Sequence, residues 1–273
     1  MTNTARRASA LAIAILMFGA CSGQGSETAP PHETLRIESR VMEESRVINV
    51  YLPPDHAANP DRAYPVLYMP DGGVLEDFPH IANTIDAKIR SGEIDAVVLV
   101  GIENTDRRRD MAGPTSVARD REIAPTAGGS GDFRRFIATE LMPEIRSRYR
   151  VTGESGIIGE SAAGLFIVET FFLEPELFDI YIAISPSIWW DDEGLVRHAA
   201  TRLANAPDLD VDLYLTSANE SDIAPPVARL VEEIRKAGVP GIRLEYQPRP
   251  DLRHDNIYRS VAPAVLQSYY SGS

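Results

Sequence analysis

The chain reads Ile157-Ile158-Gly159-Glu160-Ser161-Ala162-Ala163-Gly164 at its most informative point. The β-branched pair predicts a strand, and the apolar run 165–172 predicts a helix. A serine at the apex of such a strand, turn and helix needs small neighbours two residues before and two after, because bulk there makes strand and helix collide. Gly159 and Ala163 meet that need. Alone, the motif fits a nucleophile and an ordinary connection equally well.

Strands alternate with helices along the rest of the chain. Residues 35–41 and 46–52 alternate apolar and polar side chains and predict an antiparallel hairpin. Apolar runs predict further strands at 64–69, 96–102, 180–184, 211–216 and 242–246; the first two lack alternation, as in strands buried on both faces. Helices are predicted at 78–90, 133–149, 194–204, 227–236 and 256–269, with Pro143 kinking or splitting the second and Pro263 interrupting the last. The pattern predicts one mostly parallel, doubly wound α/β sheet with an N-terminal hairpin.

Reactive groups of such a sheet gather at the carboxyl ends of its strands. Three residue types of this kind follow predicted strands here: Ser161 comes first, acids in the segment 219–222 come next, and His254 comes last. This is the chain order of the α/β-hydrolase fold. No long insertion follows the strand 180–184, so we expect no large lid domain.

The expected catalytic roles follow from chemistry. A serine hydroxyl becomes a good nucleophile when a base takes its proton, and histidine has the suitable pKa. Of the five histidines only His254 follows the last strand, so we expect it to be the base for Ser161. The carboxylate that orients the imidazole is expected past the preceding strand. Glu220 is nearer that strand end and is the first choice; Asp222 is the alternative, or else caps the next helix.

An oxyanion hole needs two backbone N–H groups aimed at the developing charge. Ala162, which follows the nucleophile at the N-terminus of its helix, is expected to supply one. The other is expected from the loop after the strand 64–69, where Gly73 is the first choice and its neighbours Gly72 and Val74 remain open. A plain turn is the alternative, since Asp-Gly is a common turn dipeptide.

Substrate-binding candidates also lie on these loops. Trp189 and Trp190 can stack an aromatic or sugar-like group, or fill the core instead. Arg109 can bind a carboxylate or catecholate oxygen, or pair with neighbouring aspartates in a solvated loop. We expect no metal and no cofactor.

The N-terminus carries an export signal. Arg6 and Arg7 precede an apolar stretch at 8–18 that is too short to span a bilayer comfortably, and Gly19-Ala20 then leads to Cys21, the only cysteine. We expect residues 1–20 to be a lipoprotein signal peptide, 21–33 a lipidated N-terminus and tether, and 34–273 a single domain. The expected location is the outer membrane facing the periplasm, or secretion if Cys21 is not lipidated.

Charge and hydropathy narrow the partners. The formal net charge is −13, and it becomes −15 when residues 1–20 are removed with their two arginines. An acidic domain repels nucleic acid and anionic lipid, so neither is an expected partner. No second apolar run of membrane-spanning length occurs, so we expect membrane contact through the lipid anchor alone. The oligomeric state stays open.

Several segments together resemble a known family, the esterase D-like α/β hydrolases, which include siderophore (enterobactin-type) and feruloyl esterases. These segments are 45–53, 68–73, 100–110, 159–164 and 183–190. The resemblance covers nearly all of residues 34–270. It implies Ser161 as nucleophile, His254 as base, and the amides of Gly73 and Ala162 as oxyanion donors.

We therefore expect a cell-envelope serine esterase that acts on a small soluble ester, siderophore-, feruloyl- or acyl-sugar-like, through an acyl-enzyme. One alternative is a non-catalytic lipoprotein that binds a ligand or partner on a hydrolase fold. Another is an acyltransferase that uses the same residues with a different acceptor.

Overall fold

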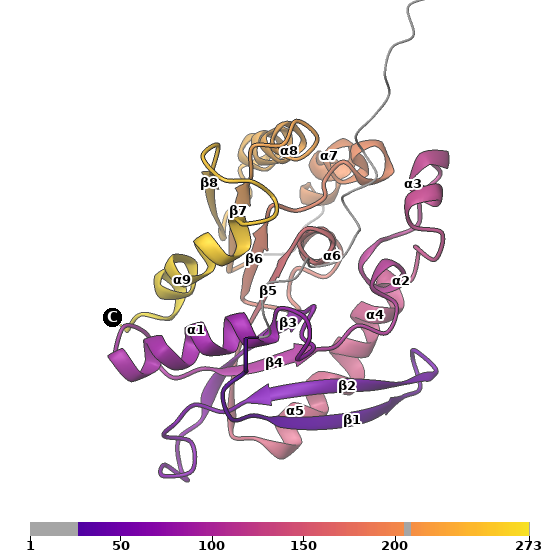
Figure 1. The fold of residues 1–273 in the computed structure, drawn as a ribbon. Coiled ribbons are helices and arrows are strands. Elements are labelled where there is room, and N and C mark those ends of the chain that lie inside the picture. The colour runs from indigo at the N-terminus through magenta and orange to yellow at the C-terminus, as the bar shows by residue number, and fades with distance from the viewer. Residues whose placement is uncertain (1–26, 205–208, 273) are drawn as a thin grey trace, which may run out of the picture.

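Eight strands form a single sheet in the computed structural model, which describes residues 27–204 and 209–272 (Figure 1). They are β1 (Glu33–Ser39), β2 (Glu44–Tyr51), β3 (Tyr64–Pro70), β4 (Val98–Ile102), β5 (Val151–Glu160), β6 (Ile180–Ile184), β7 (Val211–Ser217) and β8 (Ile242–Pro248). Their order is β1-β2-β4-β3-β5-β6-β7-β8. The β1–β2 hairpin is antiparallel and joins β4 antiparallel, whereas all pairs from β4 to β8 are parallel. The predicted mostly parallel sheet with an N-terminal hairpin is confirmed.

Helices cover both faces of this sheet. One face carries α1 (Phe78–Ser91) and α9 (Ile257–Tyr270). The other carries α4 (Ser130–Phe136), α5 (Met142–Arg148), α6 (Ala162–Leu173), α7 (Trp190–Leu203) and α8 (Ala224–Ala237). Strand β4 shows the reason, because Val98 and Val100 join one core and Leu99 joins the other. A strand buried on both faces must be apolar at every position.

Two prolines behave differently from each other. The segment predicted as one helix over 133–149 is α4 and α5 joined by a π-helical turn, η1 (Ile137–Leu141), just before Pro143. A π turn absorbs the clash between the proline ring and the preceding carbonyl. The predicted interruption at Pro263 is wrong, since α9 runs through it. Val261, Ala262 and Val265 pack in the core there, and this packing outweighs the lost hydrogen bond.

Three helical starts were not predicted. The short helices α2 (Arg107–Met111) and α3 (Ala118–Ile123) lie in the connection between β4 and α4. Helix α7 begins at Trp190 rather than Gly194, and its residues 191–193 have positive φ angles, so the first turn is not regular helix. Short segments held by tertiary contacts carry little periodic signal.

The segments predicted at the N-terminus lie mostly outside the described residues. The predicted signal peptide and Cys21 belong to the range 1–26, and the tether is described only from Glu27. There Glu27 pairs with Arg259 of α9 at 3.0 Å and accepts from Asn83 of α1. The end of the predicted tether therefore packs on the domain. Within the described ranges, no helix combines the length and hydropathy needed to cross a membrane.

Candidate active site

Ser161 occupies a sharp turn between the end of β5 and the start of α6. Its φ is +59° and its ψ is −114°, a strained combination for a residue with a side chain. The turn is held from both sides, because the Ser161 N–H donates to the Ile184 carbonyl at 3.1 Å and the Ser161 carbonyl accepts from the Ser187 N–H at 3.1 Å. The Ser161 hydroxyl lies 3.4 Å from that of Ser187. The residue therefore stands at the carboxyl end of a central strand, with the N-terminus of α6 behind it.

The fit of strand and helix at this turn depends on Gly159. A methyl group placed on Gly159 would lie 2.6 Å from the Ala163 methyl group and 3.2 Å from Ile167. Since ordinary contacts begin near 3.4 Å, the missing side chain of Gly159 makes the room that Ala163 uses. Residue 163 can therefore be alanine rather than glycine, because Gly159 has no side chain.

His254 lies in the turn before α9, and its ring reaches the loop after β6. The Nδ1 atom is 3.1 Å from the hydroxyl oxygen of Ser185. Burial lowers the pKa of His254 below its usual value, while the nearby Glu220 carboxylate opposes this shift and the Arg107 guanidinium adds to it. The imidazole is therefore neutral near pH 7, which is the form that can accept a proton.

Glu220 contacts the backbone of His254 rather than its ring. Its Oε1 atom accepts the His254 N–H at 2.8 Å, and its Oε2 atom is buried without a hydrogen-bond partner in the described structure. Asp222, the alternative acid, is exposed. The expected carboxylate is thus beside His254, but the group on Nδ1 is Ser185. No role was predicted for Ser185, although its position directly after β6 was a usable signal.

The candidate oxyanion donors differ in whether their backbone N–H groups already make hydrogen bonds. Ala162 is the first residue of α6, where an N–H has no partner within its own helix. The Gly73 N–H donates to the Glu76 carboxylate at 2.7 Å, and the Gly72 N–H donates to the Ile102 carbonyl at 2.9 Å. Among the described residues the Val74 N–H makes no hydrogen bond. The first choice, Gly73, therefore becomes available only if Glu76 moves.

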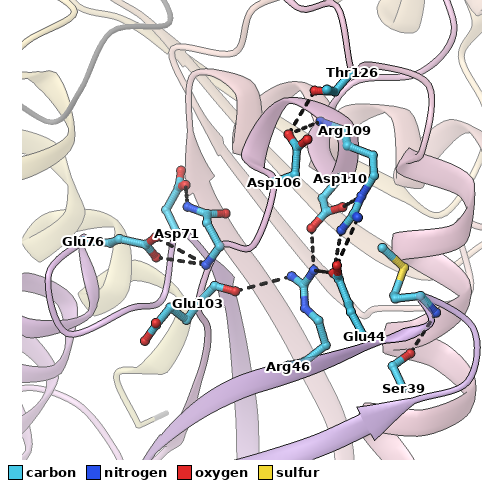
Figure 2. A network of polar contacts seen from close by, with 12 residues as sticks. Ser39, Glu44, Arg46, Asp71, Glu76, Glu103, Asp106, Arg109, Asp110 and Thr126 are labelled. Carbon is cyan, nitrogen blue, oxygen red and sulfur yellow. Dashed lines mark hydrogen bonds and ion pairs between the residues drawn. The ribbon is translucent and has the colours of Figure 1, made fainter.

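Glu76 is held by two loops at once. Besides the Gly73 amide, its carboxylate accepts the backbone N–H of Asn104 at 3.3 Å, along one of the dashed lines that leave Glu76 in Figure 2. Burial raises the pKa of Glu76, and the Gly73 amide partly offsets that effect. The loop after β3 is therefore tied to the loop after β4.

Several acidic residues interact electrostatically with Glu160, the residue before Ser161. Arg107 binds Asp71 through two hydrogen bonds of 2.7 and 2.8 Å. Burial raises the pKa of Glu160, the residue before Ser161, well above its usual value, and raises that of Asp77 to about 7. The Oε1 atom of Glu160 is buried and has no hydrogen-bond partner in the described part of the chain. Ionisable groups with strongly shifted pKa values often gather at functional sites.

Two of the predicted substrate-binding residues, Arg109 and Trp190, make hydrogen bonds to other residues of the protein. The Arg109 guanidinium is engaged by Asp110 at 2.7 Å and by both oxygens of Glu44, in the network of Figure 2. Trp190 is 4% exposed, and its indole N–H donates to the Gly113 carbonyl at 3.0 Å. Their donors are already used within the fold, so we do not retain either residue as a substrate ligand.

Trp189 faces a pocket of about 200 Å³. The pocket lies between α3, the start of α7 and the loop after β7, and its lining comprises Val117, Arg119, Asp120, Ile123, Trp189, Asp192 and Asp222. Trp189 is two residues from Ser187, whose hydroxyl lies 3.4 Å from that of Ser161, but neither Ser161 nor His254 lines the pocket. Within residues 27–204 and 209–272, no group of three His, Cys, Asp or Glu side chains is arranged to hold a metal ion.

Comparison with known proteins adds the family. The chain matches the Esterase family model, described as "Putative esterase", over residues 39–247. It is 27% identical over 245 residues to the ferri-bacillibactin esterase BesA of Bacillus subtilis, covering 80% of this chain and 82% of that protein. It is 37% identical over 143 residues to the siderophore enterobactin esterase of Emericella nidulans, covering 51% of this chain and 41% of that protein.

A solved structure shows the same fold. The IroE-like serine hydrolase from Shewanella oneidensis superposes with a TM-score of 0.79 at 24% identity, covering 88% of this chain and 80% of that one. The family match spans the sheet from the end of β1 into β8, including the Ser161 turn. The chain therefore belongs to the Esterase family, as an esterase D-like α/β-hydrolase that hydrolyses carboxylic esters.

Proposed function

We propose that the protein is a serine esterase in which Ser161 attacks the ester carbonyl and His254 accepts its proton. One observation carries this proposal: the strained Ser161 turn and the His254 loop meet at one rim, joined through the loop after β6. The lowered pKa of His254 keeps its imidazole neutral and able to act as a base.

The chemistry follows in two halves. As Ser161 attacks, His254 takes the hydroxyl proton and later gives it to the leaving alcohol, which leaves an acyl-enzyme. Water then adds to the acyl group with His254 as base again. The Ala162 N–H at the start of α6 supplies one oxyanion hydrogen bond, and the loop after β3 supplies the second from Gly73 once Glu76 releases it, or from Val74.

Glu220 acts on the charge of the imidazole. Its carboxylate opposes the fall in the pKa of His254, so it stabilises the imidazolium that forms during attack. Its bond to the His254 N–H also places the loop.

The substrate we propose is a soluble ester of the siderophore class. BesA and the Emericella protein are named for ferri-bacillibactin and enterobactin. The pocket beside Trp189 offers an indole and apolar side chains to a planar acyl group. The proposed location is the cell envelope through lipidated Cys21; replacing Cys21 with alanine should move the protein from the membrane fraction to the soluble fraction.

The test of the proposal is hydrolysis of p-nitrophenyl acetate and butyrate, with labelling by a fluorophosphonate probe. Ser161→Ala should lose at least about 1,000-fold in kcat and all labelling, because the alanine side chain has no nucleophile. Ser147→Ala, a change to an exposed hydroxyl on α5, is the matched control and should match the parent. Equal rates for Ser161→Ala and parent would refute the nucleophile.

Substrate class is tested separately. A panel of siderophore, feruloyl and acetyl-sugar esters should give the highest kcat/KM for the siderophore esters. Trp189→Ala should raise KM for aromatic esters by about tenfold and leave acetyl esters nearly unchanged, since an aromatic contact contributes about 0.5–1.5 kcal/mol. An equal effect on both kinds of ester would remove Trp189 from the substrate site.

A further inference from the structure

Ser185 is a buried loop residue with a strained backbone that is hydrogen-bonded to the neighbouring strand. It directly follows β6, is completely buried, and has a φ of +47°, in the region that favours glycine. Its N–H donates to the Thr216 carbonyl at 3.0 Å, which ties its backbone to β7. A glycine would adopt this backbone with less strain, so the hydroxyl is the property for which a serine is useful here.

The hydroxyl of Ser185 joins two loops. Its oxygen accepts the Ala218 N–H at 3.2 Å, from the loop after β7, and lies 3.1 Å from Nδ1 of His254. An amide can only donate, so that bond uses one lone pair of the oxygen. The second lone pair and the hydroxyl proton remain for the imidazole.

These remaining positions determine the tautomer of His254. If the imidazole carries its proton on Nδ1, that N–H donates to the Ser185 oxygen and Nε2 is left free to accept the proton of Ser161. If Ser185 donates to Nδ1 instead, Nε2 carries the proton and cannot act as a base. Only the first arrangement supports catalysis, and it remains satisfied when the ring becomes an imidazolium.

We propose that Ser185 is the positioning residue of His254: its hydroxyl oxygen holds the Nδ1–H tautomer and the ring orientation, while Glu220 places the backbone and supplies the negative charge. The two tasks of a single triad carboxylate are thereby divided between two residues. The inference rests on the proposed function, because it assumes that His254 is the base for Ser161.

The charged groups around His254 come from three loops. Glu220 and Asp222 lie after β7, Arg107 lies after β4, and Asp255 adjoins the histidine itself. None of them replaces Ser185 on Nδ1. A change at Ser185 therefore alters the hydrogen bond of the ring while these charges stay in place.

The experiment compares Ser185→Ala and Ser185→Asp with the parent in kcat, KM and the pH profile of kcat/KM. Ser185→Ala should lower kcat about tenfold with little change in KM, as expected for one neutral hydrogen bond, and should move the acidic limb to lower pH because the imidazolium loses its acceptor. Ser185→Asp should move that limb to higher pH, since a carboxylate favours the imidazolium. The control Ser217→Ala removes a buried hydroxyl that contacts Tyr246 instead, and should leave the limb in place.

A measurement on the parent protein covers the case in which a variant does not fold. The ¹⁵N spectrum of the histidine rings should show His254 protonated on Nδ1 above its pKa. A proton on Nε2, or an unchanged kcat and pH limb in a folded Ser185→Ala, would overturn the proposal. Failure of the proposed function is distinct, because the parent itself would then neither hydrolyse esters nor react with the fluorophosphonate.

Discussion

The contact between Gly159 and Ala163 predicts how one methyl group will disturb the nucleophile. In Gly159→Ala the new methyl would lie 2.6 Å from the Ala163 methyl, so α6 must retreat by about 1 Å to restore an ordinary contact. Overpacking of this kind costs about 1–3 kcal/mol of unfolding free energy, or about 2–12 °C in Tm for a chain of this size. Because Ser161 directly precedes that helix, a displacement of Ser161 by about 1 Å should also lower kcat/KM about 100-fold.

Ala163→Gly supplies the compensating change. Alone it should cost at most about 1 kcal/mol, the usual penalty for glycine in a helix. In the double variant the closest remaining contacts of the new methyl are Ile167 at 3.2 Å and the carbonyl carbon of residue 163 at 3.4 Å, which small shifts relieve. The double variant should therefore be more stable and more active than Gly159→Ala.

Thermal unfolding and kcat/KM on p-nitrophenyl butyrate measure both effects in a double-mutant cycle. The coupling free energy should be at least about 1 kcal/mol in the direction of mutual compensation. If Gly159→Ala matches the parent, or if adding Ala163→Gly restores nothing, the reasoning about this contact is refuted.

Three further predictions concern charge. Asp110→Asn removes the carboxylate that lies 2.6 Å from the fully buried guanidinium of Arg46, so it should lower the unfolding free energy by about 3–5 kcal/mol. Asp132→Asn, which removes one partner of an exposed pair, should change the unfolding free energy by less than about 1 kcal/mol. Chemical denaturation measures both, and equal effects would contradict the assignment. Burial lowers the pKa of His254, so kcat/KM should rise with pH to a plateau with a midpoint below 6.5. Glu220→Gln should move that midpoint lower still, because the Glu220 carboxylate raises the pKa of His254. An upward shift of the midpoint in the pH–rate profile would disprove the role of the Glu220 charge. Burial raises the pKa of Asp77 from 3.8 to about 7, so the contribution of Asp77 to stability is complete below pH 3.8 and is lost as pH rises through 7. Asp77→Asn should therefore raise Tm more at pH 8 than at pH 5. A larger rise in Tm at pH 5 would exclude this linkage.

The repeating elements were predictable because hydrophobic periodicity is local. The hairpin β1–β2, the buried strands β3 and β4, and the strand-turn-helix at Ser161 all follow from short patterns of apolar and small residues. The parallel sheet follows in turn, since repeated strand-helix pairs have few other arrangements. The loop order then brings Ser161 and His254 to one rim.

Hydrogen-bond partners were less predictable, because a side chain chooses among groups that are distant in the sequence. Arg109 was a candidate ligand until Glu44, on β2, and Asp110 engaged its guanidinium. Gly73 was a candidate donor until the Glu76 carboxylate occupied its amide. Each of these hydrogen bonds forms only when two groups pack within about 3 Å of each other, and the spacing of residues in the sequence does not specify that distance.

The sequence by itself determined the fold class and the Ser161 turn, and it predicted His254 as the base, because apolar periodicity and small-residue spacing are local properties of the chain. Only the tertiary structure decided that Ser185 meets Nδ1 of His254 while Glu220 meets its backbone. The physical reason is that three loops, after β6, after β7 and after β8, must close together before any of these atoms are within hydrogen-bonding distance.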